Sequence, residues 1–340
     1  MALLFRWRLY QLESNRCVQR RILDRTDPLC VTDSELLRRY RFPRPTIIEL
    51  IGIVKSEIEP VTKRSNSLPA VLQVCITLNF YATCCLYSNL QLSFGVSIAS
   101  ISRILHKVSR VFIAKLLPDS VTFPDDIQQE VSAQRFLELA GFPNVIGCLD
   151  GTQIAIKSPS ENEHVFVNRK GFHSLNVIAV CDAEMMFRNV VAKYPGSCLK
   201  CRFKNGEFGD KWLLGDSGFA LGPYLLTPFL HPETAGEREY NRAHRKTRVQ
   251  IERAFGILKS RFLCLSHKVS GPLSFSPAKC CAILTVCFCL HNRARRLRLP
   301  DPDNIDVENF TEDDFDETPA DPNVGVNAQT RRRVVRHYFD

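Results

Sequence analysis

The stretch from Arg248 to Phe262 restricts the fold more than any other part of the sequence. Its apolar residues recur at intervals of four, three and four positions, which is the spacing of one apolar stripe along a helix. Glu252 lies off that stripe, with Arg248 one turn before it and Lys259 two turns after it. The stretch therefore predicts a helix with one buried side and with a carboxylate, flanked by cations, at the edge of that side.

Two aspartates upstream each end a short apolar run, namely Val145–Asp150 and Lys211–Asp216. Gly151 and Thr152 follow the first run, and residues 153–157 then alternate between polar and apolar side chains. An Asp-Gly pair between two such runs is the commonest hairpin signal. We therefore expect a β-hairpin that turns at Gly151, with Asp150 at the end of its first strand.

The order of the remaining segments predicts the fold class. Residues 175–182 and 187–194 read as two more strands, Ser197 caps a helix, and residues 211–216 form a fourth strand. Residues 223–245 contain three prolines and read as a loop-rich excursion, and a buried helix is expected over 277–296. Three antiparallel strands, a helix, a strand and a helix with a carboxylate form the order of a ribonuclease H-like α/β (α+β) domain, with a mixed sheet flanked by helices.

The three carboxylates suggest metal chemistry if Asp150, Asp216 and Glu252 meet in the fold. Hydrolysis of a phosphodiester needs an activated water and a stabilised leaving oxygen, and two Mg²⁺ ions about 3.5–4 Å apart supply both. Carboxylate oxygens suit Mg²⁺ or Mn²⁺ without any histidine or cysteine. Each residue also has a plain structural interpretation: the two aspartates as turn residues, and Glu252 as an ion-pair partner on a solvated face.

The N-terminal part of the chain predicts helices. We expect helices that begin at Thr32 and Thr46 and a buried helix over residues 70–86. Residues 90–112 then show a short apolar segment, a glycine, Ser97 as a helix cap and a longer helix, which is the pattern of a helix-turn-helix. Arg103, Lys107 and Arg110 share one face of that helix and would meet a DNA groove. An ordinary helical hairpin with a solvated basic face explains the pattern equally well.

Charge is unevenly distributed, and it supports a polyanionic partner. The net charge is +9, yet residues 301–321 carry ten acidic side chains and no lysine or arginine, so the other 319 residues sum to +19. We expect a basic arm over residues 1–30, an all-α, helix-turn-helix-like region over 31–120, the α/β domain over 121–300 and a disordered tail over 301–340. The tail ends in a basic cluster, Arg331–Arg333 with Arg336, which would suit a localisation signal.

The cysteines and the apolar segments indicate a compartment. Several of the fourteen cysteines lie inside apolar runs, where free cysteine behaves as a small hydrophobe, so we expect reduced thiols and a reducing compartment. Cys198 and Cys201 form a single C-x-x-C pair, for which incidental spacing is favoured over a zinc or redox site. No apolar stretch has the composition and length of a membrane span, and no membrane role is expected.

A set of ordered motifs resembles one known family. These segments are GCLDGTQIAIKSP, VNRKGFHSLNVIAVCD, YPGS, WLLGDSGF, LLTPF, YNRAHRKTRVQIERAFGILKSRF and the LHN of residues 290–292. Together they resemble the Harbinger transposase-derived nucleases, relatives of the PIF/Harbinger DDE transposases, over residues 31–292. The resemblance implies a ribonuclease H-like, divalent-metal-dependent DNA endonuclease. It places the acidic positions of the family on Asp150, Asp216 and Glu252, and Arg248 and Lys259 would contact phosphate near the cut.

The resemblance also implies location in the nucleus and the cytoplasm and a Myb/SANT-like DNA-binding partner, and we expect a homo-oligomer. One position departs from the family, because Lys200 stands where such proteins usually carry a further aspartate after the PGS motif. A lysine there repels the cation that an aspartate would help to hold. The alternative function is therefore a catalytically inactive relative that acts as a DNA-binding or adaptor protein.

Overall fold

The structure, a computed structural model, describes residue 25 and residues 27–61, 67–191, 209–302 and 326–340. Several sequence predictions lie outside these residues: nearly all of the N-terminal arm, the helix after Ser197, Lys200, the Cys198–Cys201 pair and most of the acidic segment.

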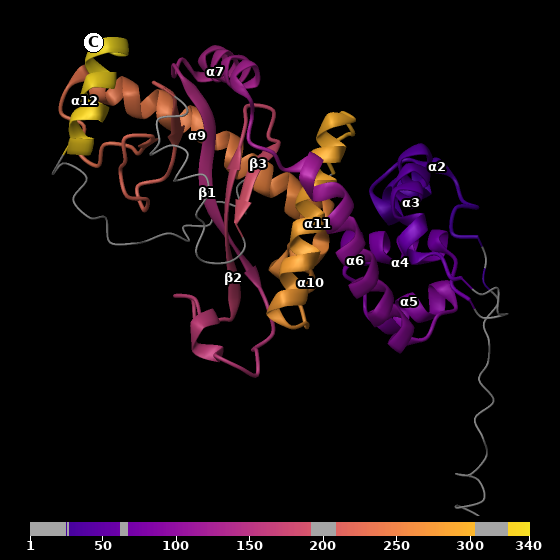
Figure 1. The fold of residues 1–340 in the computed structure, drawn as a ribbon. Coiled ribbons are helices and arrows are strands. Elements are labelled where there is room, and N and C mark those ends of the chain that lie inside the picture. The colour runs from indigo at the N-terminus through magenta and orange to yellow at the C-terminus, as the bar shows by residue number, and fades with distance from the viewer. Residues whose placement is uncertain (1–24, 26, 62–66, 192–208, 303–325) are drawn as a thin grey trace, which may run out of the picture.

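The described residues of the N-terminal region form helices, as predicted: α2 (Asp33–Tyr40), α3 (Arg44–Ile58), α4 (Ala70–Thr83), α5 (Tyr87–Phe94) and α6 (Ile98–Ser120). The Thr32 hydroxyl accepts a hydrogen bond from Glu35 N at 3.3 Å and caps α2. Helix α4 is buried on almost every side, as its largely apolar sequence predicts. Figure 1 shows α6 lying between α11 and the helices α2–α5.

The predicted turn between α5 and α6 is confirmed. Gly95 ends α5 with a positive φ of 62°, which costs glycine little, and the Ser97 hydroxyl accepts from Ser100 N at 3.3 Å and caps α6. Ile98, the first residue of α6, is 46% exposed, whereas Ile101 and Ile104 are buried.

A helix that the sequence did not predict leads into the sheet. Helix α7 (Asp126–Ala140) is capped by Asp125, whose carboxylate accepts from Gln128 N at 2.9 Å, and it ends at Gly141 with a φ of 76°. Its apolar periodicity is weak because few of its residues are buried. In Figure 1 it lies at one end of the sheet, beside the start of β1.

The sheet has five strands in the order β3-β2-β1-β4-β5. They are β1 (Val145–Ala155), β2 (Ser174–Cys181), β3 (Phe187–Val191), β4 (Trp212–Leu214) and β5 (Leu225–Leu226). β1 pairs antiparallel with β2 and β2 with β3, whereas β4 runs parallel to β1 and β5 runs parallel to β4. The mixed sheet, covered by helices, confirms the predicted ribonuclease H-like α/β class.

The predicted hairpin at Gly151 is wrong. β1 continues through Gly151, which pairs with Ile178, and Thr152 pairs with Val177. Gly151 is absent from the described glycines of positive φ, whereas a tight Asp-Gly turn requires that conformation. β2 supplies a long antiparallel partner for both halves of the run, and ladder hydrogen bonds then favour one straight strand over a turn.

Helix α9 (Ala235–Arg261) carries the amphipathic stretch and begins earlier than predicted. Thr234 and Glu237 form a reciprocal capping box at its start, so the second half of the predicted loop-rich segment is helical. Two short 3₁₀ turns, Glu163–Phe166 and Leu263–Leu265, and the short helix α10 (His267–Ser270) complete the connections.

Helix α11 (Pro277–Arg296) is the predicted buried helix, and its Asn292 joins three elements. The Asn292 amide accepts from Phe187 N at 2.8 Å and donates to the carbonyls of Phe187 and Ser120 at 2.7 Å. It therefore links α11 to β3 and to the end of α6. Its neighbour His291 contacts Met185 O at 2.9 Å, and burial lowers the pKa of His291 to about 3. The LHN motif is thus a structural junction.

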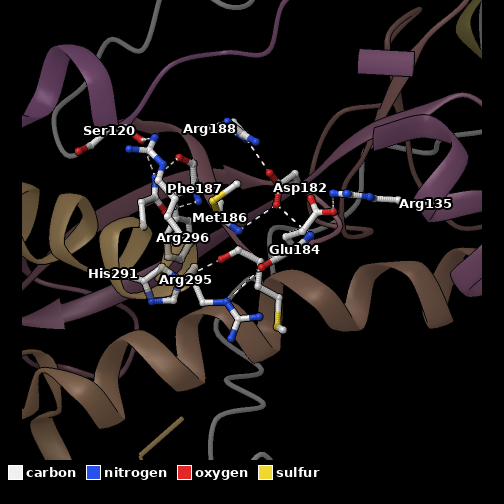
Figure 2. A network of polar contacts seen from close by, with 12 residues as sticks. Ser120, Arg135, Asp182, Glu184, Met186, Phe187, Arg188, His291, Arg295 and Arg296 are labelled. Carbon is white, nitrogen blue, oxygen red and sulfur yellow. Dashed lines mark hydrogen bonds and ion pairs between the residues drawn. The ribbon is translucent and has the colours of Figure 1, made fainter. Parts of the chain in front are cut away.

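The turn between β2 and β3 lies beside this junction (Figure 2). Asp182 is buried, and its carboxylate accepts from Glu184 N and Met186 N at 3.0 and 2.9 Å and from Arg188 Nε at 2.6 Å. Burial raises the pKa of Asp182, against the effect of Arg188. Because its oxygens are used within the turn, Asp182 shapes the hairpin.

The end of the chain forms a helix, which corrects the prediction of a disordered tail for residues 326–340. In α12 (Val326–Tyr338), Val334 and Val335 are buried. The Arg331 guanidinium, only 1% exposed, donates to the carbonyls of Thr227 and Pro228 at 3.3 and 2.8 Å. Arg331 is therefore buried in the interior and is not part of an exposed basic cluster. Composition did not reveal this, because arginine is normally a surface residue.

One apolar cluster extends from α2 through α6 and the sheet to α11 and α12, so the predicted boundary near residue 120 does not divide the core. The eleven cysteines that the structure describes are all free thiols. Within the described residues, no helix combines the length and apolarity that a bilayer crossing requires.

Candidate functional site

Asp150 lies in the middle of β1 on the face that α9 covers. Side chains alternate along a strand, so Asp150 shares a face with Cys148, whose thiol contacts Thr247 O of α9 at 3.4 Å. The Asp150 side chain is 13% exposed. Burial raises its pKa to about 6 against the opposing effect of Arg248, and the nearby carboxylates of Asp216 and Glu252 raise it further.

Asp216 reaches the same place because β4 runs parallel to β1. Cys148 pairs with Leu214 in the parallel register, and Asp150 and Asp216 each follow their member of that pair by two residues. Corresponding positions on neighbouring parallel strands lie side by side. Asp216 stands just beyond the end of β4, and its side chain is 34% exposed.

Glu252 approaches from α9, one turn after Arg248, and its side chain is 24% exposed. The four-residue spacing places both side chains on one face of the helix, and Arg248 Nη2 donates to Glu252 Oε1. The strands and the helix thus bring Asp150, Asp216 and Glu252 to the same arginine.

Arg248 stands between the carboxylates. Its Nη1 lies 3.6 Å from Asp150 Oδ2 and 3.5 Å from Asp216 Oδ1. Burial alone would lower the pKa of Arg248, but the carboxylates of Asp150, Asp216 and Glu252 outweigh it and the pKa is raised. In this structure Arg248 contacts carboxylates, and its four-residue spacing from Glu252 was the sequence signal for one of these contacts. The phosphate contact of Arg248 stays a prediction.

The carboxylate site fits a hard cation in the kind of its ligands but not in their present spacing. Three carboxylates from separate elements are the donors that Mg²⁺ and Mn²⁺ prefer. Within the part of the chain that the structure describes, however, no three His, Cys, Asp or Glu side chains stand close enough to hold one ion. Arg248 Nη1 occupies the space that such an ion would need.

The predicted basic contacts differ in accessibility. Lys259 is only 5% exposed, which does not favour the predicted phosphate contact, and that contact stays a prediction. It shares the helix face of Glu252 but lies near the end of α9, where other elements cover it. Arg103, Lys107 and Arg110 are exposed on α6 as predicted, with Lys107 Nζ donating to Ile58 O at 3.2 Å.

His244 is a neighbouring residue that sequence reasoning missed. It lies one turn before Arg248 on α9, is buried, and contacts Leu226 O at 3.3 Å. Burial lowers its pKa to about 4, so it is neutral at pH 7. It connects the start of α9 to β5, and no periodic pattern distinguished it from the other residues of that helix.

Comparisons with known proteins show which chains this sequence is similar to. A family model described as "DDE superfamily endonuclease" matches residues 149–292, which include all three carboxylates. The chain is 38% identical to mouse "Putative nuclease HARBI1" and 36% identical to its human counterpart, over 283 residues in each case and 80% of both chains. It is 25% identical to "Protein ALP1-like" of Arabidopsis thaliana over 306 residues, which cover 81% of this chain and 71% of that protein.

No solved structure matches significantly. The identity with the mouse and human proteins extends over four fifths of the sequence. The segment that the endonuclease model matches carries Asp150 in β1, Asp216 just after β4 and Glu252 in α9. The chain therefore belongs to the Harbinger transposase-derived nuclease family, within the DDE endonuclease superfamily.

Proposed function

We propose that this protein is a DNA endonuclease that depends on a divalent metal, Mg²⁺ or Mn²⁺. The observation that carries the proposal is the convergence of Asp150, Asp216 and Glu252 on one buried cationic group. Three carboxylates with a single arginine have a formal charge of −2, and their partial burial limits screening by water. Such a site favours a multivalent cation.

Asp150 and Asp216 would hold the cation from the sheet, and Glu252 would hold it from α9. When bound, the metal activates a water and stabilises the leaving oxygen of a phosphodiester. Because the strands hold the two aspartates in register, little conformational entropy of these side chains is lost when the cation binds. Arg248, on the same face of α9, would donate to the scissile phosphate, since a guanidinium forms bidentate hydrogen bonds with phosphate.

Exposed basic groups on α6 would hold the DNA. Arg103, Lys107 and Arg110 project from one face of a helix that follows a glycine turn, and cations on such a face neutralise phosphates regardless of sequence. The Myb/SANT-like partner and the nuclear and cytoplasmic location remain predictions from the resemblance, and the homo-oligomer is a separate prediction.

Substitution of Asp150 by asparagine tests the nuclease. The change keeps the size of the side chain and removes its charge, so Mg²⁺-dependent cleavage of plasmid DNA should be lost. Asp126→Asn is the matched control, because Asp126 is exposed on α7 and its loss should leave cleavage intact. Full cleavage by Asp150→Asn would exclude the proposed mechanism.

The second candidate is a catalytically inactive adaptor, and one observation favours it. Arg248 fills the space between the carboxylates, and the described residues lack a ready three-ligand group. Calorimetric titration with Mn²⁺ separates the two functions. Binding that Glu252→Gln abolishes supports the enzyme, whereas DNA binding without any cation binding supports the adaptor.

A further inference from the structure

The contacts of Arg248 are poorly matched to what a guanidinium prefers. Nη1 stands 3.5 and 3.6 Å from the nearest oxygens of Asp216 and Asp150, beyond the usual range of about 2.7–3.2 Å for an N–H···O bond. This nitrogen is buried and has no hydrogen-bond partner among the described residues. Arg248 thus balances charge between the strands, while its Nη2 donates a hydrogen bond to Glu252.

The same geometry keeps the carboxylates apart. Mg²⁺ holds its oxygen ligands at roughly 2.0–2.1 Å, so an ion bound jointly by Asp150 and Asp216 would draw their oxygens into the space that Nη1 fills. Repulsion between the guanidinium and a divalent cation at such range adds to the steric conflict. The ion and the guanidinium therefore exclude each other.

We propose that Arg248 is the resident counter-ion of the carboxylate site and that a divalent cation displaces it on binding. The displaced guanidinium then binds a phosphate of the DNA. A phosphate can accept two hydrogen bonds from the guanidinium, which the carboxylates of Asp150 and Asp216 do not do at their present distances. This inference rests on the proposed function. It adds that one side chain alternates between two anionic partners, the carboxylates in the free protein and the phosphate in the complex.

Cooperativity between metal and DNA follows. DNA gives Arg248 a second partner, which lowers the cost of vacating the carboxylates, so DNA strengthens cation binding and the cation strengthens DNA binding by the same factor. Without Arg248 the cation meets no competitor, and this route of coupling disappears.

The test measures Mn²⁺ affinity of the full-length protein by electron paramagnetic resonance, with and without a short DNA duplex. Without DNA, Arg248→Ala should bind Mn²⁺ roughly 5- to 150-fold more tightly than the wild type, the usual range of coupling between two sites. Arg253→Ala is the matched control, because Arg253 is exposed on the same helix, and its removal changes the net charge equally without opening the site. Arg248→Gln, which retains more of the side chain, serves as a second variant if the alanine variant does not fold.

The duplex should strengthen Mn²⁺ binding in the wild type and change it much less in the Arg248 variants. Weaker or unchanged Mn²⁺ affinity in the Arg248 variants without DNA would overturn the inference, and so would an equal gain in Arg253→Ala. If the wild type cleaves DNA and Asp150→Asn does not, either of these results would refute only the proposed role of Arg248 and would leave the proposed nuclease function standing. If neither the wild type nor the Arg248 variants bind Mn²⁺, both the inference and the proposed nuclease fall.

Discussion

Replacement of Asn292 by alanine should destabilise the protein without disturbing the carboxylate site. The amide makes three hydrogen bonds of 2.7–2.8 Å to Phe187 N, Phe187 O and Ser120 O. Ser120 O also accepts from Arg296 Nη2 at 3.2 Å, so it keeps a partner when the amide is removed. The N–H and C=O groups of Phe187, a fully buried residue, lose their bonds to Asn292.

The size of the effect follows from these two groups. A buried polar group left without a partner costs about 1–3 kcal/mol, so the substitution should lower the free energy of unfolding by about 4 kcal/mol. For a chain of this size that corresponds to a fall of roughly 10 °C in the midpoint of thermal unfolding. The destabilisation is a large part of the 5–15 kcal/mol, approximately, that holds a typical domain folded.

Urea unfolding followed by circular dichroism measures the change, and Mn²⁺ affinity of the folded variant measures any effect on the site. Asn89→Ala is the matched control, since Asn89 is exposed on α5 and surface changes stay within about 0.5 kcal/mol. A loss below about 1 kcal/mol for Asn292→Ala would refute the structural role. A stable variant that no longer binds Mn²⁺ would instead place Asn292 in the site.

Two further predictions concern α12 and α6. Arg331→Ala should lower the free energy of unfolding by about 2–4 kcal/mol, because charge-assisted hydrogen bonds to Thr227 O and Pro228 O and the packing on the Phe229 ring at 3.8 Å are lost. Arg332→Ala, at an exposed neighbouring position, is the control and should have little effect. Equal midpoints of urea unfolding for the two variants would contradict the role of Arg331 in anchoring α12. Joint alanine substitution of Arg103, Lys107 and Arg110 should weaken DNA binding and flatten its dependence on salt, as read from fluorescence anisotropy at several salt concentrations. An unchanged salt slope would leave that face as ordinary solvated charge.

Local chemistry made much of the fold predictable. Thr32 and Ser97 were identified as caps because a short polar side chain before an apolar period satisfies the free N–H groups of a first turn. The strand at residues 175–182 and the buried helix at 277–296 were legible from their apolar patterns. These features depend on neighbours in the sequence, and the structure confirms them.

The candidate site was predictable in its members but not in its arrangement. Asp150 and Asp216 were chosen because each ends a short apolar run, and Glu252 was chosen because it lies beside the apolar stripe of a helix. Carboxylates at such positions suit metal chemistry. That Arg248 stands between them depends on the parallel register of β1 and β4 and on the path of α9 across the sheet. No single segment encodes either relation.

By itself, the sequence determined which residues face a core, where most helices begin, and which three carboxylates can form a site, because periodicity and capping are properties of adjacent residues. Tertiary structure alone decided that Gly151 is extended, that Lys259 and Arg331 are buried, and that Arg248 pairs with Asp150 and Asp216. In each of these cases the deciding contact comes from an element distant in the chain. Burial and charge pairing depend on what covers a residue, and the covering elements are brought there only by the fold.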